Sequence, residues 1–192
     1  AAPGGKTTHM AQKMGNQGKV DALDLSKGKL DLIEESCRRL GITVVRTIKG
    51  NAAEPLPVPQ GMKYDRILTD VPCSGFGTLC KNPDLKWRRG EKDIERLKEL
   101  QFSILSNVSD YLKKGGILVY STCTVFHEEN EDVVEKFLNG HPEFQLDQID
   151  KVAFRPFVQN GYFKTFPPRD GMDGFFIGRL KRLRDLKIRE MP

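Results

Sequence analysis

The chain has 192 residues, of which 38% are hydrophobic, and its 31 Lys and Arg outnumber its 26 Asp and Glu to give a net charge of +5. This composition suits one globular domain and excludes an acidic disordered segment and a disulfide-rich secreted scaffold. The charge permits a polyanionic partner without requiring one. No apolar run reaches the roughly 18 residues of a membrane span, and no secretory signal is visible. The four cysteines lack CxxC spacing, which predicts reduced thiols in the cytoplasm.

Helical and strand-like segments alternate along the chain. In chain order we predict a helix over 5–14, a strand over 19–25, a helix to residue 40 with Ser26 as N-cap, a strand over 43–49, a Pro-containing loop over 51–61 and a strand over 64–71. A basic loop over 76–90 then precedes a helix over 92–112, a turn at 114–116, a strand over 117–123 and a helix over 128–138. Weak strands and loops follow, and a late strand spans 175–183. This alternation predicts an α/β fold with a parallel sheet, whose ligands bind at the carboxyl ends of the strands.

A Gly-rich loop, Ala1-Ala2-Pro3-Gly4-Gly5-Lys6, opens the first helix, so its backbone N–H groups can face a polar ligand. It fits the cofactor loop of a nucleoside-binding methyltransferase, the end of a P-loop (Gly5-Lys6-Thr7) or a plain turn. Asp24 closes the next strand, where a carboxylate either accepts hydrogen bonds from a ribose diol or stabilises a helix start. Asn51 follows the strand over 43–49, where it either contacts an adenine or forms a turn.

Two cysteines follow two different strands. Asp70-Val71-Pro72-Cys73-Ser74-Gly75 and Ser121-Thr122-Cys123-Thr124 both end buried strands. If these strands are parallel neighbours, Cys73 and Cys123 overlook one crevice, where a thiolate can attack an electrophilic carbon. The alternative for Cys73 is a small core residue. The spacing of Cys73, Cys80, Cys123 and His127 fits no closed zinc site, and we expect no metal.

The loop over 80–89 combines basic side chains with the only tryptophan. The residues that suit phosphates and a base face are Lys81, Lys86, Trp87, Arg88 and Arg89. The alternative is a solvated loop whose Trp87 caps the core. The segment 179–189 carries six basic residues and is weaker evidence for an RNA partner.

Four segments, in this order, resemble the signature motifs of the RNA cytosine-C5 methyltransferases of the Sun (Fmu) type. They are Ala1-Ala2-Pro3-Gly4-Gly5-Lys6-Thr7, Asp70-Val71-Pro72-Cys73-Ser74-Gly75, Asn82-Pro83-Asp84-Leu85-Lys86-Trp87 and Tyr120-Ser121-Thr122-Cys123-Thr124. Asp173-Gly174-Phe175-Phe176 resembles the closing strand of the family, so the resemblance covers nearly the whole chain. It implies a Rossmann-like class I fold with a mostly parallel sheet flanked by helices, the cofactor S-adenosylmethionine, and methylation of cytosine C5 in RNA, with ribosomal RNA favoured over transfer RNA.

The resemblance also implies roles for individual residues. The loop 1–6 would hold the methionine part of the cofactor, Asp24 the ribose and Asn51 the adenine side, with Asp70 and Pro72 at the cofactor as well. Cys123 would add to cytosine C6, and Cys73 would assist removal of the C5 proton and release of the product. Asp70 would stabilise the ring as charge builds up.

The resemblance further implies that residues 1–192 are an N-terminally truncated catalytic domain. The first strand of the sheet and an N-terminal RNA-recognition domain are expected to lie outside this chain. A P-loop NTPase domain and a non-catalytic RNA-binding fragment are the alternative functions.

Overall fold

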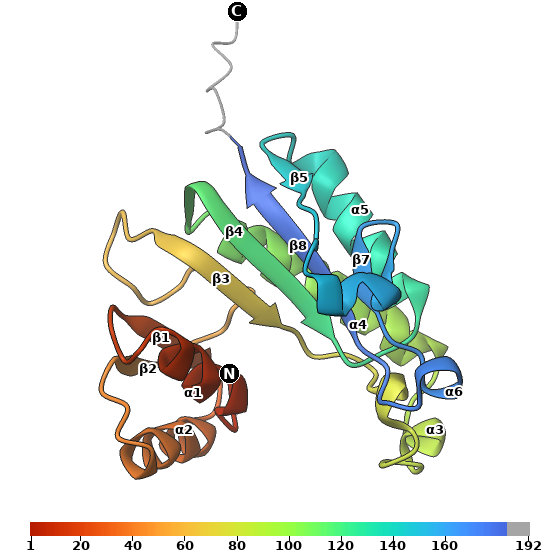
Figure 1. Ribbon diagram of the computed structural model, residues 1–192, viewed down its shortest axis with the longest axis horizontal. Helices are drawn as coiled ribbons and strands as arrows, with labels where there is room; N and C mark the ends of the chain where they lie inside the picture. The colour runs from red at the N-terminus through yellow and green to blue at the C-terminus, as the bar shows by residue number, and fades with distance from the viewer. Residues whose placement is uncertain (184–192) are drawn as a thin grey trace, which may run out of the picture. The chain divides into compact units, whose positions relative to one another are not determined.

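The structure, a computed structural model that describes residues 1–183, is an α/β fold, as predicted (Figure 1). The chain divides into two compact units, the first spanning Ala1–Gly61 and the second beginning at Met62. Within residues 1–183, no helix has both the length and the apolar character needed to cross a membrane.

The first unit is a small α/β layer. Its elements are α1 (Gly5–Lys13), β1 (Val20–Asp24), α2 (Lys27–Arg39) and β2 (Val45–Lys49), and the two strands pair in parallel. The Ser26 side chain accepts a hydrogen bond from the Lys29 N–H and caps α2, as predicted. Apolar side chains of α1, α2, β1 and the loop after α2 form its core: Ala11, Ala22, Leu30, Ile33, Cys37 and Ile42.

The second unit is built on a six-stranded sheet. In spatial order its main path runs β3 (Tyr64–Asp70), β4 (Leu112–Thr122), β8 (Phe176–Arg182), β7 (Tyr162–Lys164) and β6 (Val158–Gln159), and β5 (Phe144–Leu146) also pairs with β8. The strands β3 and β4 are parallel, whereas the remaining pairs are antiparallel. The late strand that the sequence predicts is therefore an antiparallel neighbour of β4.

Helices and short turns connect these strands. They are η1 (Phe76–Thr78), α3 (Leu85–Arg88), α4 (Glu91–Ser109), η2 (His127–Glu129), α5 (Glu131–Gly140), η3 (Val152–Phe157) and α6 (Pro167–Asp170). The helix α4 packs against α5, β3 and β4. The predicted loop over 76–90 thus contains two short helical segments.

The prediction of a turn at residues 114–116 is wrong. The helix α4 ends at Ser109, and β4 already begins at Leu112, whose fully buried side chain lies opposite Tyr64. The next pair joins Arg66 to Ile117, so the intervening β4 residues bulge out of the ladder. Gly115, at φ +74°, allows this bulge.

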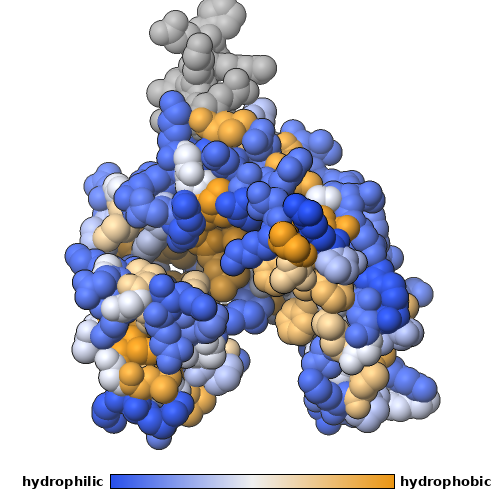
Figure 2. Space-filling model, in the orientation of Figure 1, coloured by the Kyte–Doolittle hydropathy of each residue, from blue (hydrophilic) through white to orange (hydrophobic). Residues whose placement is uncertain are grey.

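An aromatic cluster covers the edge of the second sheet. The rings of Phe154 and Phe157 pack against Phe163, with centroid distances of 5.5 and 5.6 Å. Figure 2 shows apolar surface in the region of β7, one of several apolar patches on this face. Val152, the first residue of η3, is 73% exposed.

Candidate active site at the two cysteine loops

The parallel pairing of β3 and β4 brings Cys73 and Cys123 together. Asp70 lies opposite Ser121, and the Val71 N–H donates to the Ser121 carbonyl at 3.2 Å, so both strands end level with each other. The two sulfurs are 3.3 Å apart, well beyond the roughly 2.05 Å of a disulfide. The Cys123 N–H also donates to the Cys73 sulfur at 3.3 Å. All four cysteines of the chain are thiols, as predicted.

The two sulfurs share a common electrostatic environment. The hydrogen bond with Cys123 raises the pKa of the Cys73 thiol, and burial and the negative charge of Cys123 raise it further. Two adjacent thiolates would repel each other, so the sulfurs titrate as a pair. The Cys73 thiol therefore keeps its proton.

Asp70 ends β3 with its side chain exposed. The Ser121 hydroxyl donates to its Oδ1 at 3.0 Å and orients the carboxylate. The Asp70 carboxylate, the Ser121 hydroxyl that binds it and the two cysteine sulfurs therefore lie at the carboxyl ends of β3 and β4. The sequence pattern predicts this location.

A buried polar network lies directly behind the cysteine loops. It joins Pro72, Ser74, Gln101, Thr122, Thr124, Glu129 and Asn130. Gln101, Glu129 and Asn130 were not singled out by sequence reasoning. Gln101 carries a detectable signal, because it stands at helical spacing between the buried Leu97 and Leu105 on the apolar face of α4.

A glycine fixes the Cys123 backbone. The Gly77 N–H donates to the Cys123 carbonyl at 2.9 Å, and the Gly77 carbonyl accepts from the Gly174 N–H at 2.7 Å. A Cβ at Gly77 would lie only 2.1 Å from the Gly174 carbonyl oxygen. Only glycine allows the backbones at residues 77 and 174 to lie this close together. The segment around Gly174 therefore holds Gly77, which in turn holds the Cys123 carbonyl.

The basic loop presents its tryptophan to solvent. Trp87 is 82% exposed, which excludes the alternative that it caps the core. The Lys86 ammonium lies 4.9 Å from the centroid of this ring. Arg88 pairs with Asp84 at 3.1 Å and Lys81 with Asp173 at 2.6 Å. Arg89 directly follows α3, and Cys80 is exposed.

In the first unit, Asp24 lies against the Gly-rich loop. The N–H of Ala2 donates to its Oδ2 at 3.3 Å, and the Ser26 N–H donates to its Oδ1 at 3.1 Å. Burial raises the pKa of Asp24, but these hydrogen bonds outweigh it and hold the pKa below its usual value. An ionised carboxylate thus borders the loop, as a ribose-binding acid requires.

The start of α1 leaves room for a ligand. Gly4 adopts φ +108° immediately before the helix. No atom lies within 4 Å of the position that a Cβ on Gly5 would take. Pro3 and Lys6 flank these glycines. A ligand can therefore approach the first helical turn closely, and together with Asp24 the loop fits a nucleoside cofactor.

Asn51 takes part in a local turn. Its Oδ1 accepts from the Ala53 N–H at 3.0 Å, and its Nδ2 donates to Glu54 at 2.8 Å. The turn interpretation is therefore correct, and the contact with an adenine stays a prediction.

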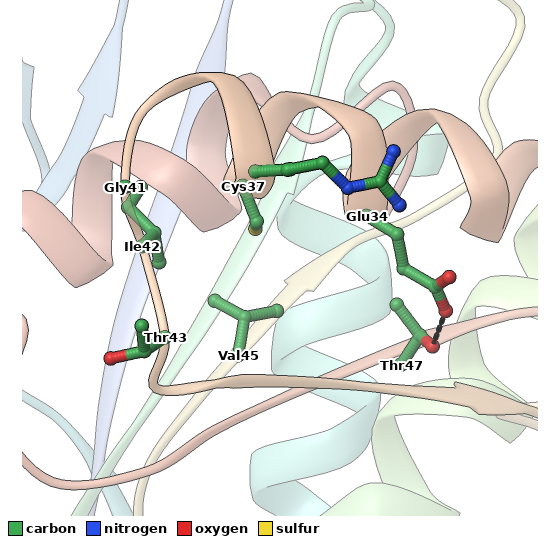
Figure 3. Close-up of a pocket in the computed structure, with 8 residues that line it drawn as sticks. Glu34, Cys37, Gly41, Ile42, Thr43, Val45 and Thr47 are labelled. Atoms are coloured by element: carbon green, nitrogen blue, oxygen red, sulfur yellow. Dashed lines mark hydrogen bonds between the residues drawn. The ribbon is translucent and has the colours of Figure 1, made fainter.

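Two further cavities adjoin these elements. The larger, of about 410 Å³, lies between α2 and β2 (Figure 3). It contains no residue that the sequence assigns to the site, and its Glu34 carboxylate accepts a hydrogen bond from Thr47. The smaller, of about 190 Å³, borders the Cys123 loop through Thr124 and includes the cationic Lys164 and Arg169. Lys164 and Arg169 are therefore two basic side chains near the Cys123 loop that the sequence analysis did not single out.

The predictions of a basic C-terminal segment and of no metal site can be compared with the structure only within residues 1–183. The basic segment 179–189 extends beyond residue 183, so its last part lies outside the described residues. Within residues 1–183, no three His, Cys, Asp or Glu side chains form a group that could hold a metal ion.

Comparison with known proteins finds one matching family and several similar chains. Residues 1–181 match the family model described as 16S rRNA methyltransferase RsmB/F. The chain is 42% identical over 186 residues to the probable ribosomal RNA small subunit methyltransferase B of Bacillus subtilis (strain 168), covering 95% of this chain and 42% of the relative. It is 40% identical over 185 residues to the corresponding protein of Synechocystis sp., with the same coverage of both chains.

A solved structure agrees with these sequence matches. The crystal structure of NSun6 from Pyrococcus horikoshii with SFG superposes with a TM-score of 0.84 at 34% identity, covering 96% of this chain and 47% of that one. The chain spans about two fifths of the length of the curated relatives it matches.

Proposed function

The chain belongs to the 16S rRNA methyltransferase RsmB/F family, and from this premise we propose that it transfers a methyl group from S-adenosylmethionine to C5 of a cytosine in RNA. The pair of sulfurs 3.3 Å apart at the ends of β3 and β4 carries this proposal. Ribosomal RNA is the favoured substrate and transfer RNA the second, and the setting is the cytoplasm. The family match removes the P-loop alternative, which also leaves both thiols without a role.

S-adenosylmethionine supplies, when bound, a methyl group on a positively charged sulfur. The loop 1–6 and Asp24 would hold it, because the side of Gly5 is open and the adjacent carboxylate is ionised. Asn51, Asp70 and Pro72 would complete the cofactor contacts. The carbonyl of Pro72 is itself fixed by the Gln101 side chain at 2.9 Å.

Cys123 acts as the nucleophile. Its thiolate forms a bond from sulfur to C6 of the target cytosine, and the electron pair of the C5–C6 double bond moves onto the ring. C5 then becomes electron-rich and would take the methyl group from the bound cofactor, whose sulfur would leave as the neutral thioether of S-adenosylhomocysteine. The target base must leave its stack to reach the sulfur. Asp70, held by Ser121, stabilises the ring while this charge develops.

Cys73 acts after methyl transfer. Once the Cys123 sulfur is bonded to carbon, it no longer carries a negative charge next to Cys73. Cys73 can then lose its proton to water and accept the proton from C5. The C5–C6 double bond re-forms, the sulfur–C6 bond breaks, and Cys123 leaves as a thiolate. Cys73, 3.3 Å from the Cys123 sulfur, would therefore act in the second half of the reaction.

The basic loop would contact the RNA. Lys81, Lys86, Arg88 and Arg89 would neutralise phosphates, and the exposed Trp87 ring would stack on a base. Lys86, which lies over this ring, adds a charge next to the stacking surface. This arrangement supports binding without sequence reading, because phosphate contacts carry no sequence information.

Trp87→Ala is expected to weaken RNA binding about 5- to 160-fold, because stacking on one aromatic ring is worth about 1–3 kcal/mol. The measurement is the dissociation constant for a fluorescent small-subunit RNA fragment at fixed salt. Val152→Ala, which trims another highly exposed apolar side chain, should leave this constant unchanged. Equal affinities of wild type and Trp87→Ala would remove Trp87 from the interface.

The proposed function is tested by calorimetric titration with S-adenosylhomocysteine and, separately, with Mg-ATP. The titrations use this chain and any longer natural protein that contains it. We expect S-adenosylhomocysteine to bind, Mg-ATP not to bind, and labelled methyl groups to appear as 5-methylcytosine in small-subunit ribosomal RNA. RNA binding by folded protein that binds no S-adenosylhomocysteine would identify the non-catalytic alternative instead.

A further inference from the structure

Glu129, at the end of η2, holds both neighbours of Cys73. Its Oε1 accepts from the Ser74 N–H at 2.8 Å and from the Gln101 side chain at 2.9 Å, and its Oε2 accepts from the Ser74 hydroxyl at 2.5 Å. Gln101 also donates to the Pro72 carbonyl at 2.9 Å. The peptide groups on either side of Cys73 are therefore tied, directly or through Gln101, to one carboxylate.

Asn130, the next residue, holds both neighbours of Cys123. Its Oδ1 accepts from the Thr122 hydroxyl at 2.5 Å, and its Nδ2 donates to the Thr124 carbonyl at 3.2 Å. Thr122 and Asn130 are both about 1% exposed or less. The amide thus bridges the residues before and after Cys123, as the carboxylate does for Cys73.

Both contacts are anchored in the core. The Tyr120 hydroxyl donates to the Glu129 carbonyl at 2.6 Å, and Glu129 and Gln101 are fully buried. In the described part of the chain, hydrogen-bond donors but no Lys or Arg pair with the Glu129 carboxylate. A buried side chain that makes three hydrogen bonds to two different segments holds those segments in a fixed geometry. The position of Glu129 therefore indicates a function in holding the loop that contains Cys73.

We propose that Glu129 and Asn130 are positioning residues that control the two thiols separately, Glu129 for Cys73 and Asn130 for Cys123. This inference rests on the proposed function. Each thiol acts in a different half of the reaction, so the backbone around each thiol has to be held by its own buried side chain. The two halves remain coupled through the hydrogen bond of 2.9 Å between the Ser74 and Thr124 hydroxyls. Loss of Glu129 should impair release, and loss of Asn130 should impair attack.

The test compares two RNA substrates. Unmodified RNA reports release, because slow release leaves protein covalently attached to RNA on a denaturing gel. RNA with 5-fluorocytidine at the target reports attack, because fluorine cannot leave C5 as a proton does and the adduct persists. The fraction of adduct and the rate of its formation therefore separate the two halves of the reaction.

Glu129→Ala is expected to increase the adduct on unmodified RNA about tenfold or more, since displacement by about 1 Å can cost 100-fold in rate. Its rate of adduct formation on 5-fluorocytidine RNA should stay within about threefold of wild type. Glu129→Gln should restore release, because its amide oxygen still accepts both N–H groups and its nitrogen can donate to Ser74. Gln101→Met, which loses the contact with Pro72, should also slow release and serves if Glu129→Ala does not fold.

Asn130→Asp should slow adduct formation on 5-fluorocytidine RNA about tenfold or more and leave no adduct on unmodified RNA. This change keeps the acceptor for Thr122 but loses the donor to Thr124. Glu128→Ala, next to both residues and exposed, is the matched control and should behave as wild type. Thermal melting verifies that each variant is folded.

The outcomes separate this inference from the proposed function. If wild type forms no adduct and transfers no methyl group, the proposed function fails. If wild type turns over but the folded Glu129 and Asn130 variants impair attack and release equally, or in the reverse assignment, the inference is overturned and the function stands.

Discussion

Cys123→Ala should abolish methyl transfer while the protein stays folded. Without the sulfur there is no bond to C6, and C5 of cytosine is too poor in electrons to take the methyl group. The expected loss is about 10⁴-fold or more, as for removal of a covalent nucleophile elsewhere. Because the side chain is only half-buried, the free energy of unfolding should fall by about 1 kcal/mol at most. The measurements are incorporation of labelled methyl groups into RNA and a thermal melt.

Cys80→Ala is the matched control for this substitution. It removes a thiol that is exposed in the neighbouring loop. It should retain full activity and form the 5-fluorocytidine adduct at the rate of wild type. Methyl transfer by Cys123→Ala within about tenfold of wild type would exclude a covalent role for this residue.

Cys73→Ala should leave the protein covalently attached to its RNA. The Cys123 sulfur can still attack and C5 can still take the methyl group, but the C5 proton has lost its acceptor 3.3 Å from the nucleophile. We expect one methyl group per enzyme and turnover reduced by about 10²–10⁴, the usual contribution of a positioned acid or base. A denaturing gel measures the fraction of protein bound to RNA.

The double substitution of Cys73 and Cys123 by alanine is the control for Cys73→Ala. It should show no adduct, because the nucleophile is absent. A Cys73→Ala protein that methylates RNA and yet runs free of RNA on the gel would reverse or remove the assigned roles. If the bond is between sulfur and C6, one modified nucleoside stays attached to the protein after the RNA is digested completely. A trapped complex that leaves no nucleoside on the protein would contradict this bond.

Local patterns sufficed to predict the elements that carry the site. Alternating and continuous apolar runs located β3 and β4, and the residues after them placed both cysteines at strand ends. The Ser26 cap of α2 was equally readable, because side-chain capping depends on neighbours in sequence. The late strand was found as well, although its antiparallel pairing with β4 was not.

Interactions between distant segments could not be read from the chain. Trp87 was compatible with a core or an exposed position, because a single aromatic residue in a loop has no periodicity. The bulge in β4 depends on which residues of β3 lie opposite, so Gly115 resembled a simple turn. Glu129 and Asn130 looked like ordinary helix-start residues, since their partners are supplied by other loops.

The sequence by itself therefore determined the order of elements, the Gly-rich loop with Asp24, and the two cysteines that each follow a buried strand. These features depend on side-chain period and on residues close in sequence. Only the tertiary structure decided that the sulfurs of Cys73 and Cys123, 50 residues apart, meet at 3.3 Å. It also decided that the buried side chains of Glu129 and Asn130 bind the loops that contain Cys73 and Cys123. Those distances follow from strand register and side-chain packing, and both are properties of the folded chain as a whole.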